Sequence, residues 1–397
     1  GNQQIPNNSY SAMLGAQNSC LGSGFLPSNY PNPDLVWESL NQTNLGIDFT
    51  LFNNKLSASF DVYDKKSKGF LFQVPLPLYL TGGGGQYGGI SAPYSNLGTM
   101  SNKGYDITLG YDLRSTGKFN WDTSLVISHY KNNLDEIANG IVLTQEVNTN
   151  GYQPVVVTNT TIGNPIGLFY GYKTDGIFKD QTVLNNAPLQ FGQAVGTGAG
   201  ETALGDVKYV DVNGDGKIDA NDKTFIGNPH PKFTYGFTNN FKYKNVDLSI
   251  FLQGSYGNDV MNLTKRAGTT NASLYDNQLV EALDYYSPAN TASNNPRPIA
   301  NSSNNNLLIS DRYVEDGSYL RIQNVTLGYS LPQDVISKYK ISRLRLYGSA
   351  QNLYTFTKYS GYDPEIGSFN QNVLLSGIDN GRYPVARTFL VGLNLEF

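Results

Sequence analysis

The chain has 397 residues, of which 28 are Tyr, 19 are Phe, 42 are Gly and only 15% are charged. No run approaches 18 consecutive apolar residues, which excludes a transmembrane helix, and the net charge of −4 gives no basic footprint for nucleic acid. Cys20 is the only cysteine, so an internal disulfide is excluded as well.

The N-terminal part predicts one hairpin between two loops. Gly1–Thr43 is rich in Asn, Ser, Gly and Pro, which indicates a loop. Asn44–Phe52 alternates apolar and polar residues, which predicts a strand, and Lys55–Asp64 is its return strand. Asn53-Asn54 predicts a two-residue turn, because Asn tolerates the positive φ of tight hairpins. A long loop is expected over Lys65–Lys103.

The next hairpin shows the alternation most clearly. Gly104–Leu113 carries Tyr105, Ile107, Leu109, Tyr111 and Leu113 on one face, with Asp106, Thr108 and Asp112 on the other. Lys118–Tyr130 returns after a short R-S-T-G turn. Further strands are predicted downstream at Phe233–Lys242, Val246–Tyr256, Ser318–Leu331, Arg343–Phe356 and Thr388–Phe397.

The last strand reads T-F-L-V-G-L-N-L-E-F, and its odd-numbered residues from Phe389 to Phe397 are apolar. The opposite face is polar or glycine, apart from Leu390. A strand that crosses a bilayer needs about 9–11 residues, with lipid on the apolar face and water on the other. We therefore expect an all-β fold, a transmembrane antiparallel β-barrel with aromatic girdles.

Short and long connections alternate between the nine predicted strands. Outer-membrane barrels have short periplasmic turns and long extracellular loops, so residues 131–232 and 257–317 are expected outside the cell, and the final strand ends at the periplasm. Nine is an odd number, whereas bacterial single-chain barrels have even strand numbers. The chain is therefore expected to be part of a barrel, unless a strand lies undetected in Gly1–Thr43 or Lys131–Lys232.

One motif carries metal chemistry. The segment from Asp211 to Asp222 matches the spacing of a twelve-residue calcium loop, with a glycine at the sixth position. The last ligand is Asp and not the Glu of an EF-hand, and no helices are expected to flank the loop. The alternative is a run of Asn/Asp-Gly turns with solvated carboxylates. The predicted ligands of this structural calcium ion are Asp211, Asn213, Asp215, the Lys217 carbonyl, Asp219 and Asp222.

Loop tyrosines are the candidate ligand-binding residues, because a Tyr ring pairs an apolar face with a polar tip that suits sugars and peptides. The alternative is packing within the girdle or the loops. The candidates are Tyr87, Tyr94, Tyr359 and Tyr362.

In addition, the chain resembles the SusC/RagA family of TonB-dependent outer-membrane transporters. Matching stretches run in order almost from end to end. They are N-P-D-L-V-W-E at Asn32–Glu38, L-F-N-N-K-L-S at Leu51–Ser57, D-V-Y-D-K-K at Asp61–Lys66, N-L-G-T-M-S-N-K-G at Asn96–Gly104, G-N-P-I-G-L-F-Y-G-Y-K-T-D-G-I-F at Gly163–Phe178, D-V-N-G-D-G-K-I-D at Asp211–Asp219, I-G-N-P-H-P-K-F-T-Y-G-F at Ile226–Phe237, F-L-Q-G-S-Y-G-N-D at Phe251–Asp259, R-Y-V-E-D-G-S-Y-L-R-I-Q-N-V-T-L-G-Y at Arg312–Tyr329 and S-A-Q-N-L-Y-T-F-T at Ser349–Thr357.

The resemblance implies that residues 1–397 form the C-terminal part of a plugged barrel of roughly 22 strands, in the outer membrane of a Gram-negative bacterium. It implies no counterpart here of the N-terminal plug or of the segment that engages TonB. It also implies active import of glycans or peptides with a SusD-like lipoprotein as a lid, and no enzymatic activity. The long loops 131–232 and 257–317 are the expected lid contacts.

The sequence is also compatible with two other interpretations. A passive porin complete in itself would have an even strand count and no plug. A soluble, calcium-stabilised carbohydrate-binding sandwich would pack its apolar strand faces against each other and not against lipid.

Overall fold

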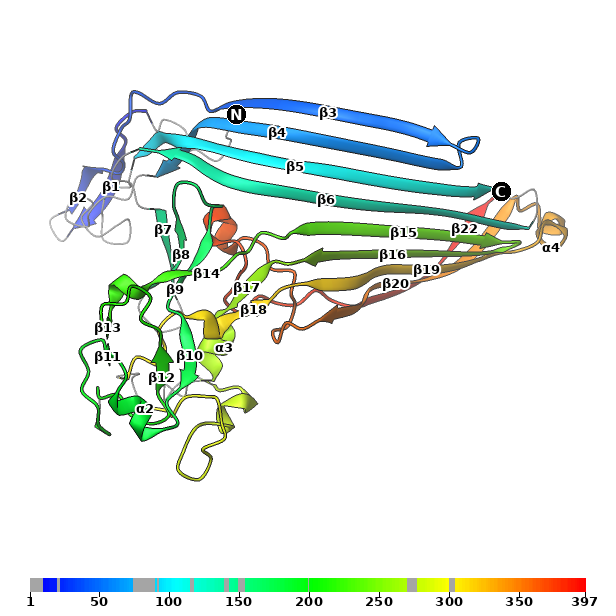
Figure 1. Cartoon of the computed structure of the whole chain (residues 1–397). Coiled ribbons are helices and arrows are strands. Elements are labelled where there is room, and N and C mark those ends of the chain that lie inside the picture. Colours follow the sequence, from blue (N-terminus) through cyan, green and yellow to red (C-terminus); the bar gives the residue numbers. More distant parts are fainter. Residues whose placement is uncertain are drawn as a thin grey trace.

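One antiparallel sheet of nine strands dominates the computed structural model (Figure 1). The structure describes residues 10–19, 22–73, 90, 93–114, 118–138, 143–148, 154–198, 200–269, 277–299 and 304–397. All nine predicted strands are present, and their order in the sheet is β22-β20-β19-β16-β15-β6-β5-β4-β3. Their bounds are β3 Ser39–Leu51, β4 Leu56–Gln73, β5 Tyr94–Arg114, β6 Phe119–Ile137, β15 Phe233–Tyr243, β16 Val246–Tyr256, β19 Tyr319–Ser330, β20 Arg343–Thr357 and β22 Thr388–Glu396.

Four strands are longer than predicted. β3 begins inside the expected loop 1–43, β4 and β5 extend into the expected loop Lys65–Lys103, and β6 continues to Ile137, so those boundaries were wrong. The extensions are paired, as Lys66 with Ser101 shows, and Lys65–Lys68 is polar on both faces, which interrupts the apolar–polar alternation before the apolar residues Phe70–Phe72. An apolar–polar alternation therefore cannot reveal them, although the backbone ladder continues.

The two faces of the sheet differ as expected for a membrane barrel. Register places Ile47, Phe60, Ile107, Ile127 and Tyr235 side by side on one face. This outer face remains apolar as far as β22, where Phe389 and Val391 are 68% and 93% exposed. The opposite, inner face carries mainly Asp, Asn, Ser and Thr.

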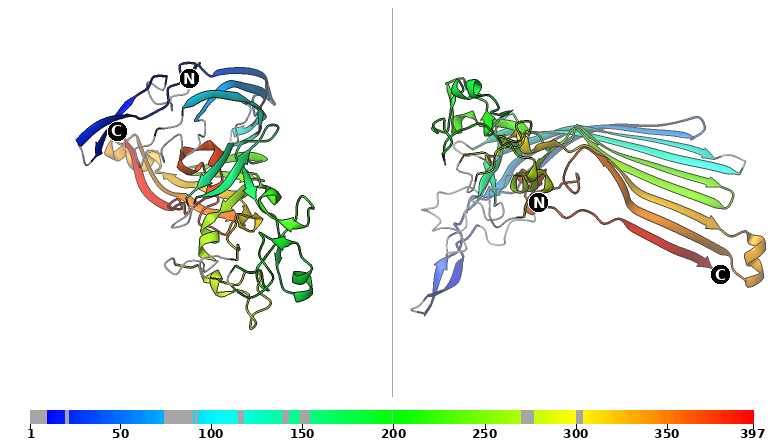
Figure 2. Two further views of the ribbon diagram at one scale, coloured as in Figure 1. Left: turned by 90° about the vertical axis from the view of Figure 1, so that its left-hand side faces the viewer. Right: turned by 90° about the horizontal axis from the view of Figure 1, so that it is seen from below.

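Short turns join the strands at one end of the sheet. Leu51 pairs with Leu56, so the first turn has four residues and not two, with positive φ at Phe52 and both asparagines. Lys244-Asn245 is a two-residue turn. The connection from β19 to β20 holds α4, Gln333–Ile336, and a short 3-10 helix, Ser337–Tyr339. The sheet curves into an open arc with β3 and β22 at its edges (Figure 2).

At the other end, the long connections fold into a compact body, here called the loop layer, which comprises the described residues of 138–232, 257–317 and 358–387 (Figure 1). None of the helices described in the structure has the length and apolar character needed to cross a membrane. A separate hairpin, β1 Leu14–Ser19 with β2 Gly22–Pro27, lies within the segment expected to be loop. The elements of the loop layer are β7 Leu143–Val147, β8 Val155–Thr160, β9 Leu168–Gly171, β10 Thr174–Ile177, α2 Gln181–Asn185, β11 Leu189–Gln190, β12 Val207–Tyr209, β13 Lys217–Ile218, β14 Thr224–Gly227, β17 Asp259–Asn262, α3 Leu263–Gly268, β18 Val314–Asp316, β21 Ile378–Asp379 and 3-10 helices at Ala220–Asp222, Val280–Leu283, Asp311–Tyr313, Phe369–Gln371 and Val373–Leu375.

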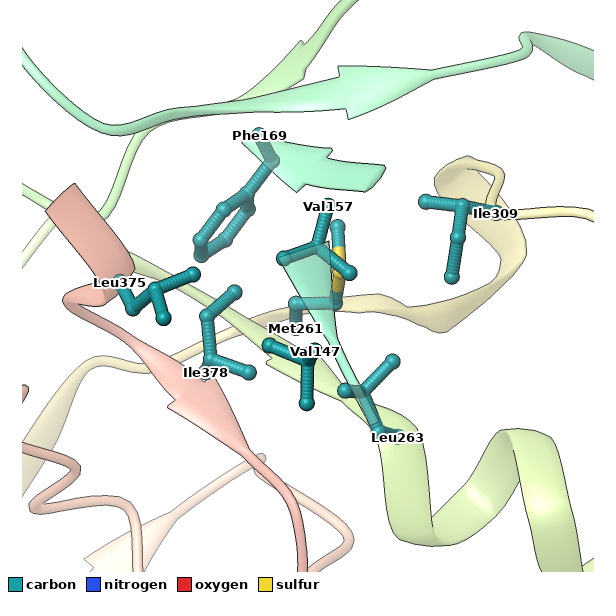
Figure 3. Packing of buried hydrophobic residues seen from close by; sticks show 8 residues of the cluster. All are labelled: Val147, Val157, Phe169, Met261, Leu263, Ile309, Leu375 and Ile378. Atoms are coloured by element: carbon teal, nitrogen blue, oxygen red, sulfur yellow. The ribbon is translucent and has the colours of Figure 1, made fainter. Parts of the chain in front are cut away.

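The loop layer has its own hydrophobic core, built from all three of its segments (Figure 3). Phe169 from the first segment, Met261 from the second and Ile378 from the third are each at most 2% exposed. Burying such a side chain contributes about 1.5–3 kcal/mol. The long loops are therefore a folded unit, and the full cluster is Val147, Val157, Phe169, Met261, Leu263, Ile309, Leu375 and Ile378.

Candidate functional site

The inner face of the sheet is the first candidate surface. Near the short-turn end it is hollowed over a volume of about 570 Å³, lined among others by Asp122, Asn240 and Ser249. These three residues lie opposite one another on β6, β15 and β16. Asn240 accepts a hydrogen bond from Ser249 and donates one to Asp122 at 2.8 Å. The wall is therefore polar and internally hydrogen-bonded.

An ion pair crosses this wall from β20 to β16. Arg345 Nε donates to Asp247 Oδ1 at 2.9 Å, and the guanidinium lies 5.2 Å from the Tyr347 ring. Gly328 on β19 lies beneath it, and a Cβ at that position would meet the guanidinium of Arg345. The glycine is required because the arginine has to pass over the intervening strand.

A second ion-pair cluster attaches the loop layer to the wall. Arg321 of β19 is only 2% exposed, and its guanidinium contacts Asp363 at 2.5 Å and Glu365 at 2.7 Å. Its Nε donates to Thr355 Oγ1 at 3.0 Å. A hollow of about 210 Å³ next to the cluster is lined by Glu365 from the last long loop and by Tyr319 and other residues of the wall. The last long loop is thus held against the inner face.

A buried carboxylate joins two segments within the loop layer. Asp206 is completely buried, and its carboxylate accepts hydrogen bonds from Arg297 Nε at 2.7 Å and from Arg297 Nη2 at 2.8 Å. The amides of Asn304 and Asn306 also donate to it, at 2.7 and 3.0 Å. Since each partner lies more than 90 positions away in the sequence, no local pattern signals this network.

The three candidate tyrosines that the structure describes differ in their surroundings. Tyr87 lies outside the described residues. Tyr94 is half-buried at the start of β5, and its carbonyl accepts a hydrogen bond from Asn32 at 2.7 Å. Tyr359 is 5% exposed and donates its hydroxyl to Asp379, and its burial and this bond raise its pKa. That ring is used for packing, whereas Tyr362, 72% exposed, is open to solvent.

The predicted calcium loop is ordered by its own backbone. Asp211 accepts from Gly214 N at 2.6 Å and Gly216 N at 2.8 Å. Both glycines have positive φ, 75° and 86°, as such sharp turns require. Asn213 and Asp215 accept from the backbone two residues further on, and Lys217 pairs with Asp219 at 3.7 Å.

Asp222 closes the loop. It is completely buried and accepts from Val212 N and Asp219 N at 2.9 and 2.8 Å. Burial acts to raise the pKa of this carboxyl, but these backbone hydrogen bonds outweigh it and lower the pKa. Its charge and that of Asp219 add to burial in raising the pKa of Tyr172 to about 12.

Oxygen donors at this spacing suit calcium, a hard ion. However, within the described parts of the chain, no three His, Cys, Asp or Glu side chains are gathered so that they could hold a metal ion. The loop carboxylates point to backbone N–H groups, and an ion would have to compete for them.

Comparison with known proteins agrees with this architecture. The family described as TonB dependent receptor-like, beta-barrel matches residues 3–353. TonB-dependent receptor P3 of Formosa agariphila is 34% identical over 379 residues, which cover 94% of this chain and 36% of that protein. TonB-dependent receptor SusC of Bacteroides thetaiotaomicron is 28% identical over 92% of this chain and 32% of its own length. The chain therefore spans less than two-fifths of these relatives.

Among solved structures, that of the RagAB peptide transporter aligns over 100% of this chain and 40% of the matched chain. The TM-score is 0.77 and the sequence identity is 24%, which shows a shared fold.

Proposed function

The chain belongs to the β-barrel family of TonB-dependent receptors, outer-membrane proteins of Gram-negative bacteria, and from this premise we propose that it forms wall and loops of an active nutrient importer. The cargo would be an oligosaccharide or oligopeptide, and TonB would supply the energy through parts of the protein other than this chain. The observation that carries the proposal is the two-faced sheet, whose hydrogen-bonded polar wall is topped by a folded loop layer. The family match argues against the soluble sandwich and the passive porin.

The import proposal has a direct test in intact cells. Cells with the full-length protein should accumulate a labelled oligosaccharide or oligopeptide, and a protonophore should abolish accumulation. Uptake that persists without the proton-motive force would favour passive diffusion and refute active import.

We further propose that the loop layer docks a SusD-like lipoprotein. Val280 and Leu283 in the segment 277–299 are 81% and 79% exposed, although both are large and apolar. Exposed apolar side chains of this kind are common in protein–protein contacts, where they become buried. The fold shared with the RagAB peptide transporter and the similarity to SusC support a partner of this kind for this chain too.

Two substitutions in the full-length protein test the docking surface. The double variant V280D/L283D is expected to lower the amount of lipoprotein that copurifies from outer membranes in mild detergent. The matched control is V335D, since Val335 is 51% exposed in α4 at the opposite end of the sheet. Equal copurification from both variants would exclude this surface as the docking site.

We also propose that the loop Asp211–Asp222 binds calcium weakly, with the ligands predicted from the sequence. The spacing, the two positive-φ glycines and the buried Asp222 support the proposal. The ion would stabilise the loop layer and take no part in transport chemistry.

A further inference from the structure

Four lysines form a strip on the outer face of β4, β5 and β6. Lys66 and Lys68 lie on the same side of β4 as Val62, because side chains alternate along a strand. Lys103 shares a face of β5 with Tyr105, and Lys131 shares a face of β6 with His129. All four are exposed. The lysine strip, Lys66, Lys68, Lys103 and Lys131, thus continues the lipid-facing surface of the barrel.

The lysine strip begins where the apolar surface ends. The row Leu45, Val62, Tyr105 and His129 is followed by the row Thr43, Asp64, Lys103 and Lys131. Lys103 lies ten positions before Leu113, near the other end of the apolar face. That is roughly 33 Å along the strand, or roughly 25 Å of height at a tilt of about 40°, which matches the height of the apolar band of an outer-membrane barrel.

The strip is at the loop-layer end of the sheet (Figure 1). Because the long loops of outer-membrane barrels are extracellular, this boundary lies at the outer leaflet. Elsewhere along the same boundary the outward positions are aromatic. Phe233 and Tyr256 stack at 5.2 Å, and Tyr354 and Phe356 lie 4.7 Å apart. The positive charge is therefore concentrated over three neighbouring strands.

The charges within the strip are only partly balanced. Asp64 pairs with Lys103 at 3.0 Å, and Asp135 lies 3.7 Å from Lys66. No ion pair joins Lys68 or Lys131 to another residue that the structure describes. Lys131 lies directly opposite Lys103 in the ladder, and like charges in that position repel each other. Asp64 pairs with Lys103, so among the described residues it is Lys131 that faces a like charge without a carboxylate partner of its own.

We propose that the lysine strip binds the phosphorylated sugar head group of an outer-leaflet glycolipid of the lipid A type. Lysine ammonium groups are compact donors for phosphate oxygens, and the apolar row below them would contact the acyl chains. The head group would lie where the strands join the loop layer. The bound lipid would therefore hold the barrel at a fixed depth in the membrane. This binding is independent of the cargo and of the lipoprotein.

The test uses the full-length protein, purified from outer membranes in mild detergent. Native mass spectrometry would count the phosphorylated glycolipids retained by the wild type, K68Q/K131Q and K68R/K131R. We expect at least a threefold loss in K68Q/K131Q and near-normal retention in K68R/K131R. The control K244Q/K338Q makes the same charge change at the short-turn end and should retain the lipid.

A titration with added lipid A, with and without its phosphate, separates head-group recognition from general affinity for acyl chains. Binding of the phosphorylated form should weaken as salt rises from about 50 to about 300 mM, and the dephosphorylated form should bind several-fold less tightly. Equal binding of both forms, or unchanged retention in K68Q/K131Q, would overturn the proposal. Resistance of the folded barrel to SDS at room temperature would confirm that every variant is folded.

Discussion

Arg321 in the barrel wall and Asp363 in the last long loop form a buried ion pair, with side chains 2% and 6% exposed and 2.5 Å between Nη2 and Oδ1. The two residues are 42 positions apart in the sequence. The contact holds the final loop against the inner face of the sheet.

Removal of one partner should release that loop. Asp363→Ala removes the buried partner of the Arg321 guanidinium and leaves it only Glu365, whose side chain is 44% exposed. Breaking a buried ion pair costs about 3–5 kcal/mol. Hydrogen exchange over residues 358–387 should therefore rise strongly. In R321M/D363L both charges are replaced by apolar groups, so most of the protection should return. Fast exchange in the double variant as well would show that shape and not charge pairing holds the loop.

The buried carboxylate of Asp206 should stabilise the loop layer by an amount similar to that of the Arg321–Asp363 pair. Asp206→Asn removes the charge that Arg297 pairs with, and we expect a loss of roughly 3 kcal/mol or more in the stability of the layer. Limited proteolysis of the purified protein would detect it. The control is Asp175→Asn, which breaks the exposed Lys208–Asp175 pair and should change nothing measurable. Equal sensitivity of both variants to protease would contradict the assignment.

Calcium binding by the Asp211–Asp222 loop can be measured by calorimetry. We expect a Kd of about 10⁻⁴–10⁻³ M, the range of extracellular modules, because the carboxylates already serve the backbone. D211N/D215N should weaken binding at least tenfold, while Asp175→Asn should leave it unchanged. An absence of binding heat in the wild type would return the loop to the plain-turn interpretation.

A pH effect is expected at His230. Nε2 lies 2.8 Å from the carbonyl of Ile166, to which it donates, and Nδ1 lies 3.3 Å from the Tyr130 hydroxyl. Burial lowers the pKa of this imidazole, more than the hydrogen bond to Ile166 raises it. Below a pH of about 6.5 the unfolded segment takes up a proton that the folded one resists, so local stability falls as the pH drops.

Hydrogen exchange on either side of that value, at pH of about 7.5 and about 5.5 and corrected for intrinsic rates, would test the direction of this effect. Protection around residues 163–167 should decrease in the wild type at the lower pH. In His230→Asn the pH dependence should be much smaller. Protection that increases on acidification would contradict the depressed pKa.

One glycine should be irreplaceable for packing in the barrel wall. A Cβ on Gly104 would meet the His129 carbonyl and lie 2.5 Å from the Tyr63 hydroxyl. Gly104→Ala is therefore expected to destabilise the barrel by about 1–3 kcal/mol, as overpacking does. At Gly236 the nearest atom, at 3.4 Å, belongs to the ring of Phe251, so Gly236→Ala is the tolerated control. The yield of heat-modifiable barrel would compare the two.

The sequence alone determined the nine spanning strands, the two faces of the sheet and the alternation of turns and loops. Each depends on a period of two within about ten residues, which can be recognised without knowing the neighbours. The same kind of local pattern located the glycine and carboxylate spacing of the Asp211–Asp222 loop.

The extent of the strands and the fold of the long loops depend on tertiary contacts. β4 and β5 continue through Lys66 and Ser101 because they pair, although neither face is apolar there. Phe169, Met261 and Ile378 come from three distant segments and pack in one core. The hydroxyl of Tyr359 donates a hydrogen bond to Asp379. Contacts between residues far apart in the chain are set by the folded backbone, and no local periodicity encodes them.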